Sequence, residues 1–67
     1  MAIHKVIEVI SQSEVSWEDA AQLAVQDAAK TIKGIKAIYI SHLQGDVEKG
    51  KIVRFRVNAK ITFEVKG

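Results

Sequence analysis

The chain has 67 residues, of which 48% are hydrophobic and 27% charged, and it contains neither cysteine nor proline. This length leaves room for one small domain, residues 1–67, whose folding hides only about 60% of the surface that the unfolded chain exposes. Without cysteine the chain can form no disulfide and no thiolate metal site, which are two common supports of small domains. We therefore predict that it is stabilised by association with copies of itself.

The sequence also carries few signs of a membrane or nucleic-acid partner. No apolar run approaches the roughly 18–20 residues of a membrane span, and the N-terminal residues lack the pattern of a secretory signal. The net charge is only +2, and no aromatic side chains alternate with the basic ones as in nucleic-acid binding motifs. We predict a cytoplasmic protein that binds neither membranes nor nucleic acids.

The first predicted element is a strand from Ile3 to Ile10. This segment, IHKVIEVI, is rich in β-branched residues and partly alternating. Residues 11–14 are polar and typical of a turn, so we expect the strand to end before them.

A helix is predicted to begin at Trp17. Ser16 followed by Asp19 resembles a capping box, and an acid in the first turn complements the helix dipole. Gly34 after Lys33 is typical of a helix C-cap. The positions at helical spacing are mostly small, namely Trp17, Ala20, Ala21, Ala24, Ala28, Thr31 and Ile32. Such a face allows a close approach to a sheet, so we expect the bulk of the core to come from the sheet and from Trp17, Leu23, Val25 and Ile32.

The second half of the chain predicts a β-hairpin. A strand from Lys36 to Val47 has an irregular phase, which indicates a bulge or burial on both faces. The segment Asp46–Lys51 supplies a charged, glycine-bearing connection. From Val53 to Val65 apolar and polar residues alternate strictly, so the last strand is expected to curve around the helix or to reach a neighbouring subunit.

The residues give no indication of an enzyme. Catalysis requires a nucleophile with a base, paired carboxylates, or a bound metal or cofactor, and His4 and His42 lie on separate strands without ligand spacing. Glu14, Glu18 and Asp19 are acids that a helix start favours without any metal. Asp46 and Glu48 lack the ligand series of a calcium loop, so any cation there would be weakly held and shared between subunits. We predict no metal site within one chain.

Three cations lie on one face of the last strand, namely Arg54, Arg56 and Lys60. They either form a solvated face with salt bridges to acids of neighbouring subunits, or hold an anion such as a phosphate or nucleotide. The sequence leaves both alternatives open.

The order of these elements, with the segments KVIEVI, SWEDAAQLAVQDAAKTI and GKIVRFRVNAKITFEV, resembles the dodecin family over nearly the whole chain. The resemblance implies an α+β fold in which a three-stranded antiparallel sheet (β-α-β-β) wraps around one helix. It also implies a homododecameric hollow shell with a flavin (FMN, FAD or riboflavin) bound between subunits for storage.

Two positions that match the family's flavin site depart from its pattern. The resemblance places a flavin-stacking tryptophan at Ala37 and a flavin-pairing glutamine at Arg56. Alanine has no π surface, and arginine donates hydrogen bonds without accepting any. Gln44 stands where flavin-binding members often carry an arginine, which weakens any phosphate contact. Trp17 is expected to pack in the core or an interface and not to replace the missing indole.

We therefore predict a non-enzymatic oligomeric shell for flavin or a related small ligand, with flavin affinity weakened at Ala37, Gln44 and Arg56. The alternative is a structural or cation-binding dodecamer that holds calcium or magnesium and no organic cofactor.

Overall fold

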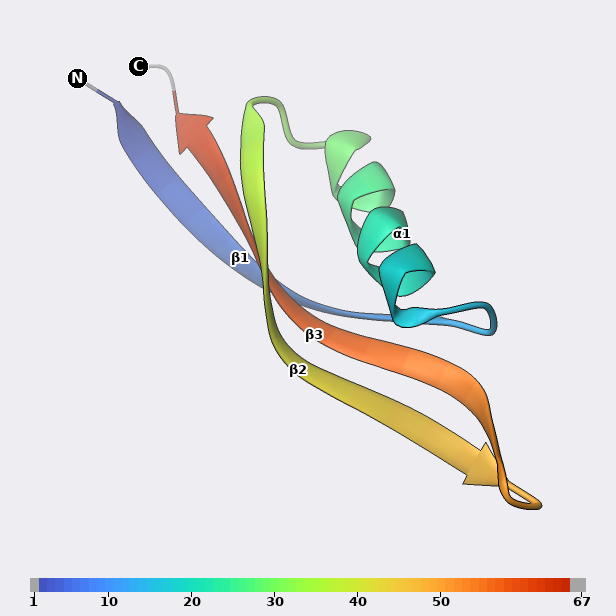
Figure 1. Cartoon of the computed structure of the whole chain (residues 1–67). Coiled ribbons are helices and arrows are strands. Elements are labelled where there is room, and N and C mark those ends of the chain that lie inside the picture. The colour runs from blue at the N-terminus through green and yellow to red at the C-terminus, as the bar shows by residue number, and fades with distance from the viewer. Residues whose placement is uncertain (1, 66–67) are drawn as a thin grey trace.

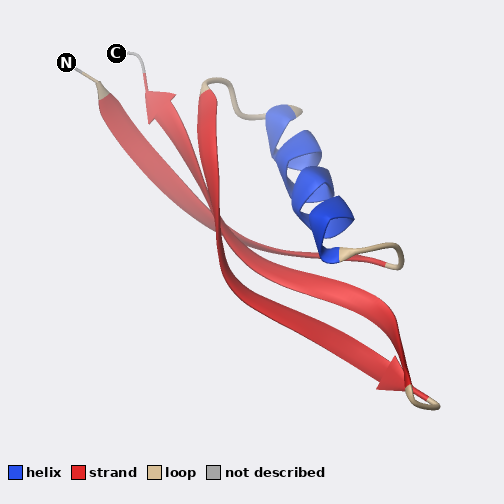
Figure 2. Ribbon diagram, viewed as in Figure 1, coloured by secondary structure: helices blue, strands red, loops and turns tan. Residues whose placement is uncertain are grey.

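The computed structural model describes residues 2–65 as one sheet and one helix (Figures 1 and 2). In chain order the elements are β1 (Ile3–Ser13), α1 (Trp17–Ala29), β2 (Ile35–Glu48) and β3 (Lys51–Val65). All strand pairs are antiparallel, and the sheet order β1-β3-β2 places the last strand in the centre. The predicted α+β fold is confirmed.

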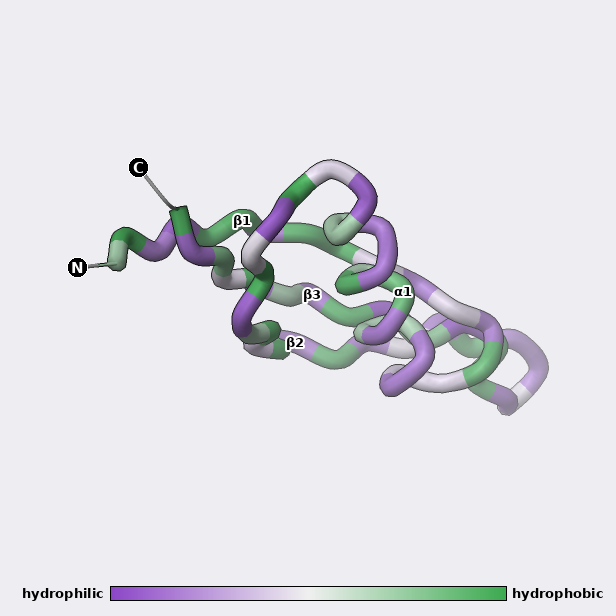
Figure 3. Tube along the Cα trace, turned by 90° about the horizontal axis from the view of Figure 1, so that it is seen from above, coloured by the Kyte–Doolittle hydropathy of each residue, from purple (hydrophilic) through white to green (hydrophobic). Residues whose placement is uncertain are grey.

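The core is a thin layer between α1 and β3. Seen along the sheet, α1 lies across one face of the three strands (Figure 3). The alanine stripe predicted from the sequence, Ala20, Ala24 and Ala28, is buried in this layer. It meets Val57, Ala59 and Ile61, which are the buried apolar positions of the alternating strand. The small side chains let the helix approach closely, but Leu23, which we expected in the core, is 42% exposed.

The start of α1 is as predicted, and its end is not. The Ser16 hydroxyl accepts a hydrogen bond from the Asp19 backbone N–H at 2.9 Å, which satisfies one of the free donors of the first turn. The helix ends at Ala29, before the predicted Lys33. Gly34 has a left-handed φ of 81°, but it lies directly before β2, and its carbonyl accepts from the Glu64 N–H at 2.9 Å. No helix within residues 2–65 is long and apolar enough to cross a membrane.

β1 is longer than predicted, because its last residues are polar but still paired. It continues through Ser13, and Gln12 lies opposite Arg56 of β3. Polar residues 11–13 therefore belong to the strand, since the turn begins only after them.

The irregular phase of β2 comes from bulges. Lys36 is an extra residue in β2 between the pairs Ile35/Phe63 and Ala37/Thr62. Ser41 is a second extra residue, between the pairs Ile40/Ala59 and His42/Asn58. Ser41 is fixed by a hydrogen bond from its hydroxyl to the Asn58 carbonyl, at 3.1 Å. Each bulge shifts the alternation of side chains in β2 by one residue. Ile38, Ile40 and Leu43 therefore all face the side of the sheet on which α1 lies.

The β2–β3 hairpin extends beyond the start of α1 (Figure 1). Its turn is made by Lys49 and Gly50, with φ of 52° and 77°, the positive values of a tight hairpin turn. We call the part of the hairpin from Leu43 to Phe55 the distal arm. It gives the chain an elongated shape, with principal extents of 51 × 20 × 13 Å.

Candidate functional site

The face of the sheet away from α1 carries Ala37, Gln44 and Arg56, the three residues for which the sequence resemblance implies a flavin site. Cross-strand pairing places Gln44 beside Arg56. Ala37 instead pairs with Thr62, which is six residues from Arg56 along β3, or about 20 Å in a strand. Within one chain the three residues therefore share a face without converging on one ligand.

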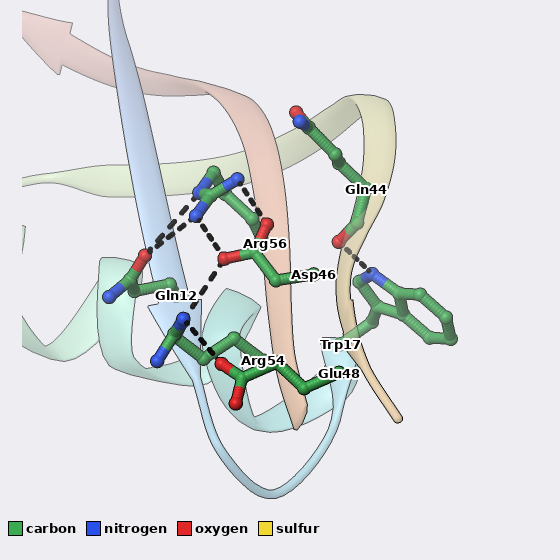
Figure 4. A network of polar contacts seen from close by, with 7 residues as sticks. All are labelled: Gln12, Trp17, Gln44, Asp46, Glu48, Arg54 and Arg56. Atoms are coloured by element: carbon green, nitrogen blue, oxygen red, sulfur yellow. Dashed lines mark hydrogen bonds and ion pairs between the residues drawn. The ribbon is translucent and has the colours of Figure 1, made fainter. Parts of the chain in front are cut away.

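Arg56 is held by residues from both neighbouring strands (Figure 4). Its Nη2 and Nη1 donate to the two carboxylate oxygens of Asp46 at 2.7 and 3.1 Å, which is a bidentate ion pair. Its Nε and Nη2 also donate to Oε1 of Gln12 at 3.3 and 3.2 Å. The guanidinium thus joins β1, β2 and β3, and most of its donors are already used.

Asp46 also accepts from Arg54, whose Nε lies 3.0 Å from Oδ2 (Figure 4). Arg54 makes a longer contact of 3.5 Å with Glu48. The hydrogen bonds from Arg56 and then Arg54 lower the pKa of Asp46 below its usual value of 3.8. The same pairing with Asp46 raises the pKa of Arg54. Asp46 is therefore charged at neutral pH and neutralises one of two closely spaced arginines.

This ion-pair network changes how the basic face is interpreted. The sequence predicted either salt bridges to acids of neighbouring subunits or an anion site formed by Arg54, Arg56 and Lys60. The structure gives both arginines carboxylate partners, Asp46 and Glu48, within their own chain. An anionic ligand would have to compete with these carboxylates for the guanidinium groups.

Trp17 fixes the start of α1 to the distal arm. Its indole Nε1 donates to the Gln44 carbonyl at 3.0 Å (Figure 4). Its ring meets Phe55 edge to face, with centroids 4.8 Å apart and planes at 80°. A Cβ on Gly45 would lie 3.6 Å from Trp17, an ordinary contact, but only 3.1 Å from Cγ2 of Ile52, so this glycine leaves room for the Ile52 side chain. Trp17 is a packing residue, as the sequence predicted.

Several acidic residues are engaged in contacts within the chain. Oδ2 of Asp19 accepts from the Ser13 hydroxyl at 2.6 Å, and Asp46 is paired with two arginines. Among residues 2–65 no three His, Asp or Glu side chains are grouped so that they could hold a metal ion.

Sequence reasoning missed Gln12 and Asp46 as partners of Arg56. Gln12 was assigned to a turn because polar residues end the β-branched run, and Asp46 was assigned to the hairpin connection. A register counted back from the Lys49–Gly50 turn places Asp46 next to the arginines, because the strands run right up to a two-residue turn. Counting the register back from the turn could therefore have predicted the pairing of Asp46 with the arginines.

The ion-pair network predicts an acid-sensitive contribution to stability. Because the folded pKa of Asp46 lies below 3.8, its contribution is present above the unfolded pKa and is lost as pH falls through the folded value. We expect Asp46→Asn to lower the Tm at pH 7, and the difference from the unmodified chain to shrink as the pH falls below 3.8. Glu48→Gln is the matched control, since Glu48 is 65% exposed and makes the longer contact. A Tm difference for Asp46→Asn that stays constant from pH 7 to pH 2 would contradict this role.

Replacing Trp17 with phenylalanine tests the anchor on the distal arm. Trp17→Phe keeps an aromatic ring against Phe55 but removes the donor to the Gln44 carbonyl. We expect the free energy of unfolding to fall by about 0.5–1 kcal/mol, the net value of such a hydrogen bond. Chemical denaturation at fixed protein concentration measures it, and an unchanged midpoint would show that the hydrogen bond contributes nothing.

Comparison with known proteins supports the assignment that the fold suggests. The family model for Dodecin matches residues 3–66. The curated protein Calcium dodecin from Mycobacterium tuberculosis is 29% identical over 66 residues, which cover 98% of this chain and 93% of that protein.

Several solved structures have the same fold as this chain. The tt0972 protein from Thermus thermophilus has a TM-score of 0.93 at 21% identity, covering 100% of this chain and 98% of that one. Dodecin from Streptomyces coelicolor has a TM-score of 0.91 at 23% identity, covering 98% and 94%. The crystal structure of the Mycobacterium tuberculosis calcium dodecin has a TM-score of 0.81 at 28% identity, covering 96% and 91%. With its β-α-β-β fold and a family match over nearly its whole length, the chain belongs to the dodecin family.

Proposed function

We propose that the chain assembles with copies of itself into a closed shell of the dodecin type and acts by binding a small ligand, without catalysis. The observation that carries this proposal is the size of its surface. The chain exposes 5128 Å², whereas a compact monomer of its mass exposes roughly 4,200 Å². The excess is close to the ~800 Å² that one partner buries in a standard interface.

The exposed surface is also unusually apolar for a chain that stays alone. Among residues 2–65, nine large hydrophobic residues are exposed, namely Ile3, Val6, Ile10, Val15, Leu23, Tyr39, Leu43, Val47 and Ile52. The buried core of the same residues, by comparison, has six hydrophobic residues, four of which are alanines. Self-association would cover part of the first set and strengthen a core that is small by itself.

Weak flavin binding is the second part of the proposal. Ala37 is exposed and offers no aromatic surface, and Arg56 is already held by Asp46 and Gln12. A flavin edge would therefore meet a guanidinium that is engaged elsewhere and has no acceptor. We infer that the shell binds flavin weakly, and that a related ligand uses a different set of contacts.

The alternative is a shell that holds a divalent cation. It is favoured by the calcium dodecin of Mycobacterium tuberculosis, a relative that matches nearly the whole chain. In this case carboxylates from different subunits would meet at an interface, because the acids of one chain are not grouped as ligands within residues 2–65. The cytoplasmic location and the number of twelve subunits stay predictions.

One set of measurements on the purified protein separates these functions. Native mass spectrometry tests the shell, and we expect a single closed species near twelve chains. A riboflavin titration followed by fluorescence is expected to show no quenching at micromolar protein. Calcium with and without a chelator tests the alternative: a Tm that rises with calcium and falls with chelator favours a cation-binding shell. A monomer at micromolar concentration would overturn the proposal as a whole, and micromolar riboflavin affinity would overturn the weakened flavin site.

A further inference from the structure

The distal arm has an apolar side that α1 does not cover. Leu43, Gly45 and Val47 share one side of β2, and a bulge at Val53 turns Ile52 to the same side. Trp17 and Ile52 both lie against Gly45. The side chains of Leu43, beside the start of α1, and of Val47 and Ile52, beyond Trp17, are 61%, 63% and 46% exposed. Isolated exposed apolar residues are ordinary, but a row of three on a projecting hairpin is typical of a contact surface.

A groove lies at the other edge of the sheet, between β1 and α1. It has a volume of about 580 Å³ and is lined by apolar side chains that include Ile7, Val9, Leu23 and Ile32. This volume lies within the roughly 300–1,000 Å³ range of binding pockets, so the groove has room for several aliphatic side chains. Leu23 belongs to the groove, which explains why it is exposed instead of lying in the core.

We propose that the apolar side of the distal arm of one subunit, formed by Leu43, Val47 and Ile52, packs into the β1–α1 groove of the next subunit. This inference rests on the proposed self-assembly and assigns the two surfaces that make it. The occupant of the groove is a second copy of this chain, because the surface excess of the chain is about the area of one standard interface.

Charges beside the two surfaces complement each other. On the rim of the groove Asp27 and Lys30 form an exposed ion pair, with Nζ and Oδ1 3.9 Å apart. The tip of the arm carries the exposed acid Glu48 beside the exposed cations Lys49 and Lys51. Because both surfaces carry both signs, an acid of one subunit can meet a cation of the next without like charges having to face each other.

The two surfaces are different, so the contact is heterologous. A subunit that places its arm in one neighbour still has a free groove for the arm of another. Such contacts generate rings when the rotation between subunits closes, and a second kind of contact between rings would complete a shell. An arm that paired with another arm would satisfy only two subunits and leave both grooves open.

A mixing experiment tests the assignment. Ile52→Asp places a charge on the arm and leaves the groove intact, and Leu23→Asp places one in the groove and leaves the arm intact. We expect each variant alone to lose the closed shell and run as a smaller species by native mass spectrometry. An equimolar mixture is expected to give a heavier species with both variants in equal amounts, because one intact arm can still enter one intact groove. Val15→Asp is the control, since Val15 is 73% exposed and belongs to neither surface.

The outcomes separate this inference from the shell itself. If the unmodified chain is monomeric, the proposed shell does not exist. A shell that persists in either variant, or a mixture no heavier than its components, would overturn the arm and groove assignment alone. If a charged variant does not fold, single-cysteine variants decide, because the chain has no cysteine of its own. Ile52→Cys mixed with Leu23→Cys is expected to form the mixed disulfide in at least tenfold excess over Ile52→Cys mixed with Val15→Cys, and equal yields would overturn the assignment.

Discussion

Ile61→Ala is expected to lower the free energy of unfolding by about 2–5 kcal/mol, the cost of removing a large aliphatic side chain from a well-packed core. Ile61 is fully buried in the middle of β3 and packs in the cluster with Ala24 and Ala28. Alanines cannot extend into the cavity, and a backbone held between two strands cannot collapse to fill it. The loss is a large part of the roughly 3–10 kcal/mol expected for a domain of this length.

Urea denaturation at one fixed protein concentration measures this loss, because the stability of a self-associating chain depends on concentration. Ile61→Val is the graded control and should cost only about 0.5–1.5 kcal/mol. Val15→Ala, at a position that is 73% exposed, should change the midpoint very little. A loss below 1 kcal/mol for Ile61→Ala would mean that the layer between α1 and β3 is not the core of the protein.

Most of the fold was predictable because its signals are local. The alternation in β3 and the alanine spacing in α1 each follow from the period of one element, and the six buried hydrophobic residues of 2–65 all lie at positions that these two patterns mark. The cap at Ser16 is equally local. The helix end was predicted too late, because Gly34 has the left-handed φ of a C-cap but lies directly before β2. A glycine with a left-handed φ can end a helix or lead the chain into a strand, and the sequence could not distinguish these two roles.

The candidate site was less predictable because it depends on register between strands. Arg56 was found as a position by resemblance, but its partners Gln12 and Asp46 lie 44 and 10 residues away in sequence. Which residues face one another across three strands is decided by the turn and the bulges, and the bulges at Lys36 and Ser41 have no sharp sequence signal. An irregular phase indicated that a bulge existed in β2, and its position needed the structure.

Restoring the two missing groups of the family's flavin site is expected to restore flavin binding. We predict that Ala37→Trp combined with Arg56→Gln raises riboflavin affinity at least tenfold, which is about 1.4 kcal/mol. The indole would supply a stacking surface, and the amide would both donate and accept at the edge of the ring. Arg56→Gln also removes the guanidinium from the network, while Asp46 keeps its ion pair with Arg54 at 3.0 Å. The change therefore leaves the Asp46 carboxylate paired.

Fluorescence quenching of riboflavin measures the affinity, and native mass spectrometry verifies that the variant still assembles. The matched control is Tyr39→Trp with Arg56→Gln. Tyr39 pairs with Lys60 and lies on the same face as Ala37, two residues along the strand, so the control adds the same indole about 7 Å away. Binding that improves only with tryptophan at position 37 supports the alignment of this chain with the family's site. A double variant that assembles normally and binds no better shows that the subunits present a different pocket, because both chemical groups would then be present and only their relative placement could differ.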